Sequence, residues 1–403
     1  MRLSNIDAVA AHLTDGEVSR VAGRLMEARH RMTPATIRSV EPIFLKLPLE
    51  RPILSPFGRL DARPNLLVLV RASDGAEGLG EIWANFPPWG CGERIAIVRN
   101  VIAPMLVGET LDDPRRLYGL MHRRLRLLAN QWGAPGPVHQ AVAGVDIALW
   151  DAHARRAGKP LAHLLRDDGA KPDRVEVYAS GVAPPHVEQT IASARARGHT
   201  RFKIRVAFGE EKDRDTLAAA RRAAPDAPIM ADANQTMSRA YFRALLPALR
   251  DARLEFLEEP FPVDDTDAYR EWPRDAGLPL AFGENAQGLA SLDEVIALAD
   301  VVQPDITKTG GVSEGLEIGR RAVAVGRKLC LHMFGGAVGL YASAHVTAAI
   351  AGAHWLEMDA NPNPLLDLTL EQKPAVEDGA LLLPSGDGLG VTLAPGAVER
   401  WAA

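Results

Sequence analysis

The sequence predicts an α/β protein in which a modified TIM barrel of the (β/α)7β type follows an N-terminal α+β capping domain. After Pro172, short apolar stretches alternate with alanine-rich amphipathic stretches such as 213–224 and 315–325. This is the pattern of parallel strands joined by helices. The candidate strands begin near residues 175, 201, 228, 254, 278, 300, 329 and 353. Eight such units predict a closed barrel, whose chemistry lies at the carboxyl ends of its strands.

The segment before the barrel has a different pattern. Residues 36–75 alternate apolar and polar side chains, and Asp74-Gly75 is a hairpin signal. Residues 78–83 predict a third strand. Helical patterns follow at about 92–105 and 113–129.

A long helix is expected at about 137–157, where Gly158-Lys159-Pro160 ends it. We therefore expect four parts: an N-terminal extension (1–35), a capping domain (36–135), the barrel with the catalytic site (136–375) and a C-terminal segment that returns to the cap (376–403).

Composition excludes several classes of protein. The chain has 46 basic and 51 acidic residues, a net charge of −5, so neither nucleic acid nor a membrane is an expected partner. Two distant cysteines, Cys91 and Cys330, provide neither a disulfide framework nor zinc-site spacing. The N-terminus lacks the apolar core of a signal peptide, and no apolar run is long enough for a membrane span. A cytoplasmic location is the expectation.

Three acidic residues recur at equal spacing along the predicted barrel. Asp232, Glu258 and Glu284 each end a short apolar run, and consecutive ones lie 26 residues apart. Equal positions in successive units lie side by side on one rim of the barrel, where unpaired carboxylates would repel each other. Oxygen-only ligands favour a hard cation. The sequence therefore predicts that these three residues bind Mg²⁺, one ion per site, with Mn²⁺ as an alternative.

Other strand ends carry polar residues. Lys203 and Arg205 lie two apart and point to the same side of their strand, where they need an anionic partner. Asn234 shares a side with Asp232 and is expected to orient a metal ligand or substrate. Glu259 and Asn285, beside the second and third acids, are further candidates for these roles. Glu258 rather than Glu259 is chosen as the ligand because neighbours in a strand alternate.

The last three strands supply a candidate base. Asp305 ends the sixth strand and His332 the seventh, so Asp305 can bind one imidazole nitrogen while the other faces the substrate. Glu357 ends the eighth strand. A protonated Glu357 would donate a hydrogen bond to a developing oxyanion, whereas an ionised one would pair with Lys203 or Arg205.

The chain resembles the enolase superfamily over roughly residues 36–395. In chain order the motifs are Lys203-x-Arg205, Asp232-x-Asn234, Glu258-Glu259-Pro260, Gly283-Glu284-Asn285, Asp305, His332 and Glu357. The resemblance implies Mg²⁺-dependent removal of the proton alpha to a substrate carboxylate, which gives an enediolate. Asp305 with His332 resembles the mandelate racemase subgroup, whereas muconate-cycloisomerase-like members have a lysine base at position 305.

One departure from that subgroup affects the reaction. Mandelate racemase has a second lysine, its other base, where this chain has Arg205, and arginine is a poor base. We therefore expect syn dehydration of an acid sugar to a 2-keto-3-deoxy acid, with His332 alone handling the proton. Lys203 and Arg205 would bind the substrate carboxylate or polarise it. Cycloisomerisation or epimerisation of a related acid or lactone, and a non-catalytic ligand-binding role, are the alternatives.

Substrate specificity in this family comes from the cap. Residues 54–59 match the family's mobile loop by position, and residues 83–89 are a second candidate. The candidate lid residues are Phe57, Arg59, Trp83 and Trp89. Packing within the cap is an equally good reading of the aromatic residues. The family resemblance also implies a homo-oligomer, a dimer or an octamer, with a small-molecule carboxylate as the other partner.

Overall fold

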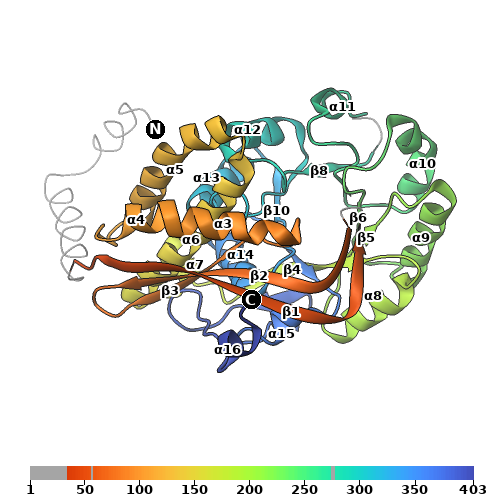
Figure 1. Cartoon of the computed structure of the whole chain (residues 1–403). Helices are drawn as coiled ribbons and strands as arrows, with labels where there is room; N and C mark the ends of the chain where they lie inside the picture. Colours follow the sequence, from red (N-terminus) through yellow and green to blue (C-terminus); the bar gives the residue numbers. More distant parts are fainter. Residues whose placement is uncertain (1–33, 56–57, 274–276) are drawn as a thin grey trace, which may run out of the picture. The chain divides into compact units, whose positions relative to one another are not determined.

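The cap is built on a three-stranded antiparallel sheet (Figure 1). The computed structural model describes residues 34–55, 58–273 and 277–403, so residues 1–33 of the expected extension lie outside the described residues. The strands β1 (Ile37–Ser55), β2 (Gly58–Ala72) and β3 (Glu77–Ile82) pair in that order. The expected hairpin forms at Asp74-Gly75, where Gly75 has φ +90°, a conformation that glycine adopts without strain.

The helices of the cap follow the sheet. A short 3-10 turn, η2 (Pro88–Gly90), leads into α3 (Cys91–Ile97), and α5 (Pro114–Trp132) begins at the cap residue Asp113. The single helix expected at 92–105 is instead divided by a π-helical turn, η3 (Val98–Ile102), before α4 (Ala103–Leu106). Pro104 lies in this stretch and has no N–H to donate to the preceding turn, which interrupts regular α-helical bonding.

The long helix α6 (Pro135–Arg156) packs directly on β3. A Cβ atom at Gly80 would lie 1.9 Å from the carbonyl oxygen of Gly144, and one at Gly78 would lie 2.1 Å from that of Ala148. Strand and helix therefore touch backbone to backbone, and only glycine fits at these two positions of β3.

Eight parallel strands form the barrel, and β11 pairs with β4 to close it. They are β4 (Arg174–Val182), β5 (Phe202–Arg205), β6 (Ile229–Asp232), β7 (Leu257–Glu258), β8 (Leu280–Phe282), β9 (Val301–Val302), β10 (Lys328–Leu331) and β11 (Trp355–Asp359). Each begins within three residues of its predicted start, which confirms the barrel.

Within the described chain, one principal helix follows each of the first seven strands, giving the predicted (β/α)7β order (Figure 1). These helices are α8 (Val187–Ala196), α9 (Glu210–Ala223), α10 (Arg239–Asp251), α11 (Thr266–Arg270), α12 (Gly288–Leu298), α13 (Gly311–Ala324) and α14 (Ala337–Ala349). The shorter α7 (Leu161–Leu165) precedes the barrel.

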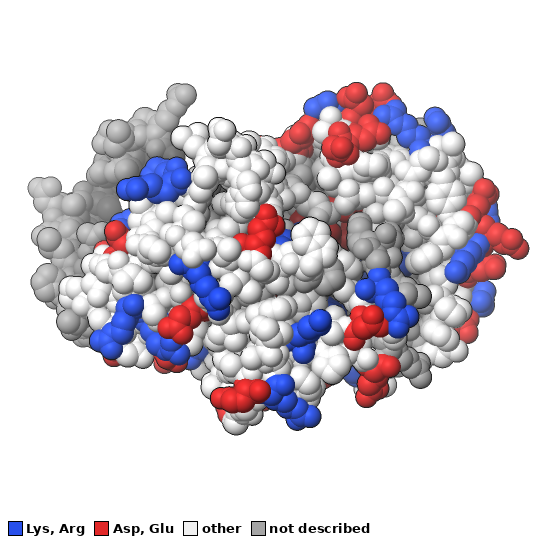
Figure 2. Space-filling model, viewed as in Figure 1, with Lys and Arg blue, Asp and Glu red and all other residues white. Residues whose placement is uncertain are grey.

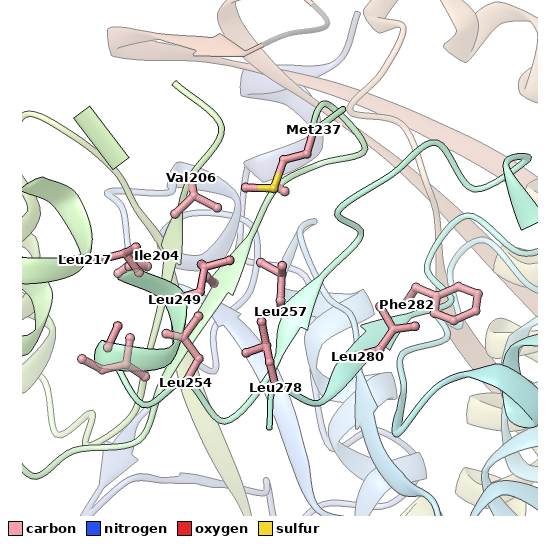
Figure 3. Close-up of a cluster of buried hydrophobic side chains, with 14 of the residues drawn as sticks. Ile204, Val206, Leu217, Met237, Leu249, Leu254, Leu257, Leu278, Leu280 and Phe282 are labelled. Atoms are coloured by element: carbon pink, nitrogen blue, oxygen red, sulfur yellow. The ribbon is translucent and has the colours of Figure 1, made fainter. Parts of the chain in front are cut away.

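Alternation along the strands separates two apolar layers. Outward residues such as Ile204, Leu257 and Leu280 pack with helix residues, including Leu217 and Leu249 (Figure 3). Inward residues fill the barrel as a second cluster: Tyr178, Met230, Phe256, Ala281, Val301, Cys330 and Trp355. Because side chains alternate, Lys203 points inward between outward neighbours, and the polar strand ends lie above this filled interior.

The C-terminal segment contacts both parts. After α15 (Pro364–Asp367), β12 (Val376–Glu377) pairs with β13 (Ala380–Leu382), which runs antiparallel to β4. Beyond α16 (Ala397–Trp401), the backbone N–H of Ala403 donates to the carbonyl oxygen of Phe44 in β1 at 3.0 Å.

Charged side chains of both signs are interspersed on the face shown in Figure 2. Among the described residues, the helices are all too short or too polar to cross a bilayer.

Candidate active site

Charged residues form one row across the carboxyl ends of four neighbouring strands, β5 to β8. In the parallel ladders, Arg205 of β5 pairs with Asp232 of β6, and Asp232 pairs with Glu258 of β7. Glu284 follows β8, two residues beyond its end. Neighbouring strands lie about 4.8 Å apart, so the strand pairing brings the predicted acids to one rim of the barrel.

Asp232 is held by its own loop and faces a cation. Asn234 donates to it from the backbone N–H at 2.8 Å and from Nδ2 at 2.9 Å. The left-handed φ of Asn234, +42°, turns the chain back so that this contact forms. Arg205 Nη1 lies 3.7 Å from Oδ2 of Asp232, and the Arg205 side chain is 26% exposed. Arg205 is thus the more accessible of the two cations on β5.

Lys203 joins two buried carboxylates. Its Nζ lies 2.7 Å from Oε1 and from Oε2 of Glu258, and 2.8 Å from Oε1 of Glu357. Burial by itself would lower the pKa of Lys203, but Glu258 and Glu357 raise it well above its ordinary value. Of the two readings of Glu357, the structure therefore favours the ion pair.

Two residues of the barrel interior, not predicted from the sequence, complete this network. Gln303 Nε2 donates to Oε2 of Glu258 at 2.7 Å, and Tyr178 OH lies 3.4 Å from Oε2 of Glu357. Gln303 is two residues before Asp305, hence on the same side of the chain. That spacing was the signal that could have found it.

Glu259 does not follow the alternation assumed from the sequence. It has a left-handed φ of +37° and is buried, as Glu258 is. Asn285 Nδ2 donates to both of its carboxylate oxygens at 3.0 Å and to Oε1 of Glu284 at 3.0 Å. Strand β7 ends at Glu258, so both Glu258 and Glu259 turn toward the rim of the barrel. Asn285 connects the ends of β7 and β8.

His332 lies between two carboxylates. Its Nδ1 is 2.8 Å from Oδ2 of Asp305, as predicted, and its Nε2 is 2.5 Å from Oε2 of Glu284. The other oxygen of Asp305 accepts from the N–H of Thr307 at 2.8 Å and from its Oγ1 at 2.6 Å. Asp305 is therefore fixed in place and orients the imidazole.

The charges of this group depend on one another. Burial alone would lower the pKa of His332, but Glu284, Glu357 and Asp305 raise it well above its ordinary value. Burial would likewise raise the pKa of Glu284, yet His332 and Lys308 hold it well below its ordinary value. With Glu284 turned toward Nε2, the imidazole is held in its protonated form.

The cap contributes one residue that contacts this group. The Trp83 ring lies 6.0 Å from that of His332, centroid to centroid, and Lys308 Nζ lies 4.3 Å from the Trp83 ring centroid. Lys308 also lies 2.9 Å from Oδ1 of Asn285, so it belongs to the site although it is not among the residues predicted from the sequence.

Two of the remaining lid candidates lie apart from these contacts. Trp89 is 81% exposed. Arg59 is also exposed and pairs with Asp61 at 2.7 Å. Phe57 falls outside the described residues.

The expected metal centre can be judged from its donors. Asp232, Glu258 and Glu284 are buried or nearly so and offer only oxygen, which suits a hard divalent cation. Among the described residues, however, no three His, Cys, Asp or Glu side chains are grouped closely enough to hold a metal ion. The predicted ligands instead bind Asn234, Lys203 and His332. The oxygen donors and the order of their strands suit a hard divalent cation. To bind it, these three side chains must rotate away from their present partners.

Two family models together match most of the chain. Residues 186–397 match the enolase C-terminal domain-like family, and residues 39–166 match the mandelate racemase/muconate lactonizing enzyme N-terminal domain. The chain belongs to the enolase superfamily, in the mandelate racemase/muconate lactonizing enzyme subgroup.

Relatives with different reactions are equally similar to this chain. Muconate cycloisomerase 1 of Rhodococcus opacus is 31% identical over 92% of this chain and 99% of its own length. The L-talarate/galactarate dehydratase of Salmonella typhimurium is also 31% identical, over 83% of this chain and 82% of its own length.

Solved structures agree on the fold. A mandelate racemase/muconate lactonizing enzyme from Bordetella bronchiseptica, 38% identical, superposes with a TM-score of 0.83 over 91% of this chain and 99% of its own. An enolase from an alpha proteobacterium, 27% identical, has a TM-score of 0.82 over 92% of this chain and 100% of its own, and contains bound magnesium. The protein is thus an enzyme of the enolase superfamily that acts on carboxylates, and family members bind Mg²⁺.

Proposed function

We propose that His332 removes the proton alpha to the carboxylate of an acid sugar and returns it to the leaving hydroxyl on the beta carbon. The C–H and C–O bonds break on the same face, water leaves, and the enol product becomes a 2-keto-3-deoxy acid. The single observation that carries this proposal is one oriented base: His332 Nδ1 lies 2.8 Å from Oδ2 of Asp305. On the side of the described site formed by β5, the candidate residues are the cations Lys203 and Arg205.

The opposite flank supports dehydration over two-base racemisation. Lys203 is bound to Glu258 and Glu357, which hold its pKa well above the ordinary value, so it remains an ammonium ion. Arg205, the other cation on β5, is not a proton acceptor at ordinary pH. A reaction in which His332 both takes and returns the proton needs no partner on that flank. We assign binding of the substrate carboxylate to Arg205.

Asp232, Glu258 and Glu284 would hold the divalent cation. When bound, it neutralises the negative charge that builds up on the substrate carboxylate as the alpha proton leaves. Asn234 and Asn285 would keep the ligands oriented through their bonds to Asp232 and Glu284. Glu284 must turn away from His332 before Nε2 accepts a proton, which links ligand binding to the charge of the base.

The test is a screen of mono- and diacid sugars with Mg²⁺, in heavy water, with semicarbazide detection of 2-keto acids. Dehydration gives a semicarbazone that wild type produces and His332→Asn does not. Chelation of the metal by EDTA abolishes it. If recovered substrate contains deuterium and no keto acid forms, the reaction is epimerisation and not dehydration.

Cycloisomerisation is the second candidate, because muconate cycloisomerase 1 is as similar to this chain as the dehydratase is. It would appear as loss of a lactone or anhydro-sugar acid without release of water. A purely ligand-binding role is disfavoured by the Asp305–His332 pair, since binding alone needs no oriented base. Ligand binding in the complete absence of turnover would reverse that judgement.

A further inference from the structure

Arg63, on β2 of the cap, is fully buried with most of its hydrogen-bonding capacity unused. Its Nη1 lies 3.0 Å from Oδ2 of Asp359, and its guanidinium carbon lies 4.6 Å from the centroid of the Phe334 ring. Nε and Nη2 have no partner among the described residues. Burying unpaired donors of a charged group is costly, so this arrangement requires an explanation.

The unpaired hydrogen-bonding groups belong to Arg63 and not to its partner Asp359. Asp359 also accepts from the backbone N–H of Asn361 at 3.0 Å, from Asn361 Nδ2 at 3.1 Å and from Asn363 Nδ2 at 3.3 Å. The carboxylate is saturated, whereas Nε and Nη2 of the guanidinium are buried without a hydrogen-bond partner among the described residues. An ion pair that only joined cap to barrel would leave the cost of burying these donors uncompensated.

Arg63 also has a defined position relative to the reacting groups. Asp359 and Glu357 lie two apart on β11 and so share a side, and Phe334 follows His332 by two residues. Glu357 Oε2 is 3.9 Å from His332 Nε2. With a rise of about 3.3 Å per residue, Asp359 lies about 6.6 Å further toward the mouth of the barrel than Glu357. That offset suits the far end of a short-chain acid whose near end meets His332.

We propose that the unpaired Nε–Nη2 edge of Arg63 binds the distal carboxylate of a dicarboxylate substrate. This edge presents two parallel N–H donors, which match a carboxylate in two-point contact. The inference rests on the proposed function, because it assigns the substrate class of the same site: diacids rather than monoacids. Arg63 acts in specificity and takes no part in proton transfer.

The two members of the ion pair give changes of opposite sign. Arg63→Met removes the distal charge, and we expect kcat/KM for galactarate to fall about 100-fold relative to galactonate. Asp359→Asn removes the competing anion, and the same ratio should rise by a few fold. Arg63→Lys, which keeps a charge without the fork, should fall between wild type and Met. If the ion pair were purely structural, both variants would instead lower kcat/KM equally for the two acids.

A matched control separates loosening of the cap from loss of recognition. Tyr118→Phe removes a hydrogen bond between cap helix α5 and barrel helix α13, away from Arg63. This variant should change kcat/KM for galactarate and galactonate by the same factor. A selective loss of galactarate activity in this variant would overturn the assignment to Arg63.

Binding without turnover tests the inference independently of the reaction. With Mg²⁺ present, calorimetry should show tighter binding of 2-oxoglutarate than of 2-oxopentanoate, and Arg63→Met should erase that preference. If this holds while no acid sugar reacts, the diacid site stands and the dehydration proposal fails. If acid sugars react but neither variant alters the preference for diacids, dehydration stands and the role of Arg63 is refuted. Equal binding of both oxo acids by wild type would also refute it.

Discussion

Two clusters of buried carboxylates in this molecule differ in what compensates them. At the barrel mouth, Glu258 and Glu284 face Lys203 and His332 at 2.7 and 2.5 Å. His332 and Lys308 hold the pKa of Glu284 well below its ordinary value, whereas burial raises the pKa of Glu258 to about 8 in spite of the opposing effect of Lys203. Of the two, Glu284 is the acid that its basic neighbours keep charged in spite of burial.

The second cluster lies where cap helices α5 and α6 meet α13. Asp146 accepts from the N–H of Ser313 at 2.8 Å and from its Oγ at 2.7 Å, and Glu314 accepts from the hydroxyl of Tyr118. Burial raises the pKa of Asp146 to about 8 and that of Glu314 to about 7. The comparison of Glu284 with Asp146 and Glu314 teaches that the neighbours of a buried acid decide whether burial raises its pKa: two basic side chains offset burial at Glu284, and none does so at the other two.

The largest expected effect is at the charged cluster. His332→Asn should lower kcat by about 10³-fold or more, because the proposed reaction has no other base. The fold should persist, since asparagine still bonds to a neighbouring carboxylate. Steady-state kinetics with any acid sugar that the screen shows to be a substrate measures kcat, and circular dichroism measures whether the fold persists. His122→Asn on α5 is the control and should keep full activity, whereas unchanged turnover in His332→Asn would remove His332 as the base.

The next effect is on stability at the same cluster. Lys203→Met leaves Glu258 and Glu357 buried without their shared cation, and the free energy of unfolding should fall by about 3–5 kcal/mol. Denaturant titration in EDTA measures it, because added Mg²⁺ would supply the missing charge. A loss no greater than that of Tyr118→Phe would show that Lys203 does not compensate the acids.

The protonated cluster should make stability depend on pH in the opposite sense from a salt-bridged acid. Its acids have folded-state pKa values above their ordinary ones, so their stabilisation is complete below pH 4.5 for Glu314 and below pH 3.8 for Asp146. It is lost as the pH rises through about 7 and 8.

We therefore expect the unfolding free energy to fall between pH 5 and pH 9, with about 1–3 kcal/mol of that loss due to Glu314. Glu314→Gln should remove this share, because the amide does not ionise. Thermal melts of both proteins across this range test the prediction. Parallel pH profiles would show that Glu314 is not the titrating group.

The smallest effect is expected for the hydroxyl in that joint. Tyr118→Phe should cost about 1 kcal/mol at pH 5, since one hydrogen bond is lost. At pH 9 the cost should be larger, because an ionised Glu314 then lacks its only donor among the described residues. Chemical denaturation at the two pH values decides this, and equal costs would contradict it.

The barrel could be predicted because its signals are local. Apolar runs recur at the spacing of strand–helix units, so every strand start and the row of Asp232, Glu258 and Glu284 follow from sequence order. The Asp305–His332 contact was predictable for the same reason, since consecutive strands are neighbours.

What escaped prediction depends on contacts between distant segments. Arg63 of the cap meets Asp359 of β11, and Trp83 of the cap lies over Lys308, although each pair is far apart in the sequence. Glu259 turns inward because its backbone is left-handed, which strand alternation does not anticipate. The alternating pattern of a single strand carries no information about either kind of contact.

The backbone contact between β3 and α6 has a consequence for protein engineering. Gly80 and Gly144 meet without room for a methyl group, so the two surfaces must be inherited together. A chimera that grafts the specificity module of one relative onto the catalytic scaffold of another should place its crossover after Arg156 and not ahead of Pro135. Splicing between the two glycines would set mismatched surfaces face to face.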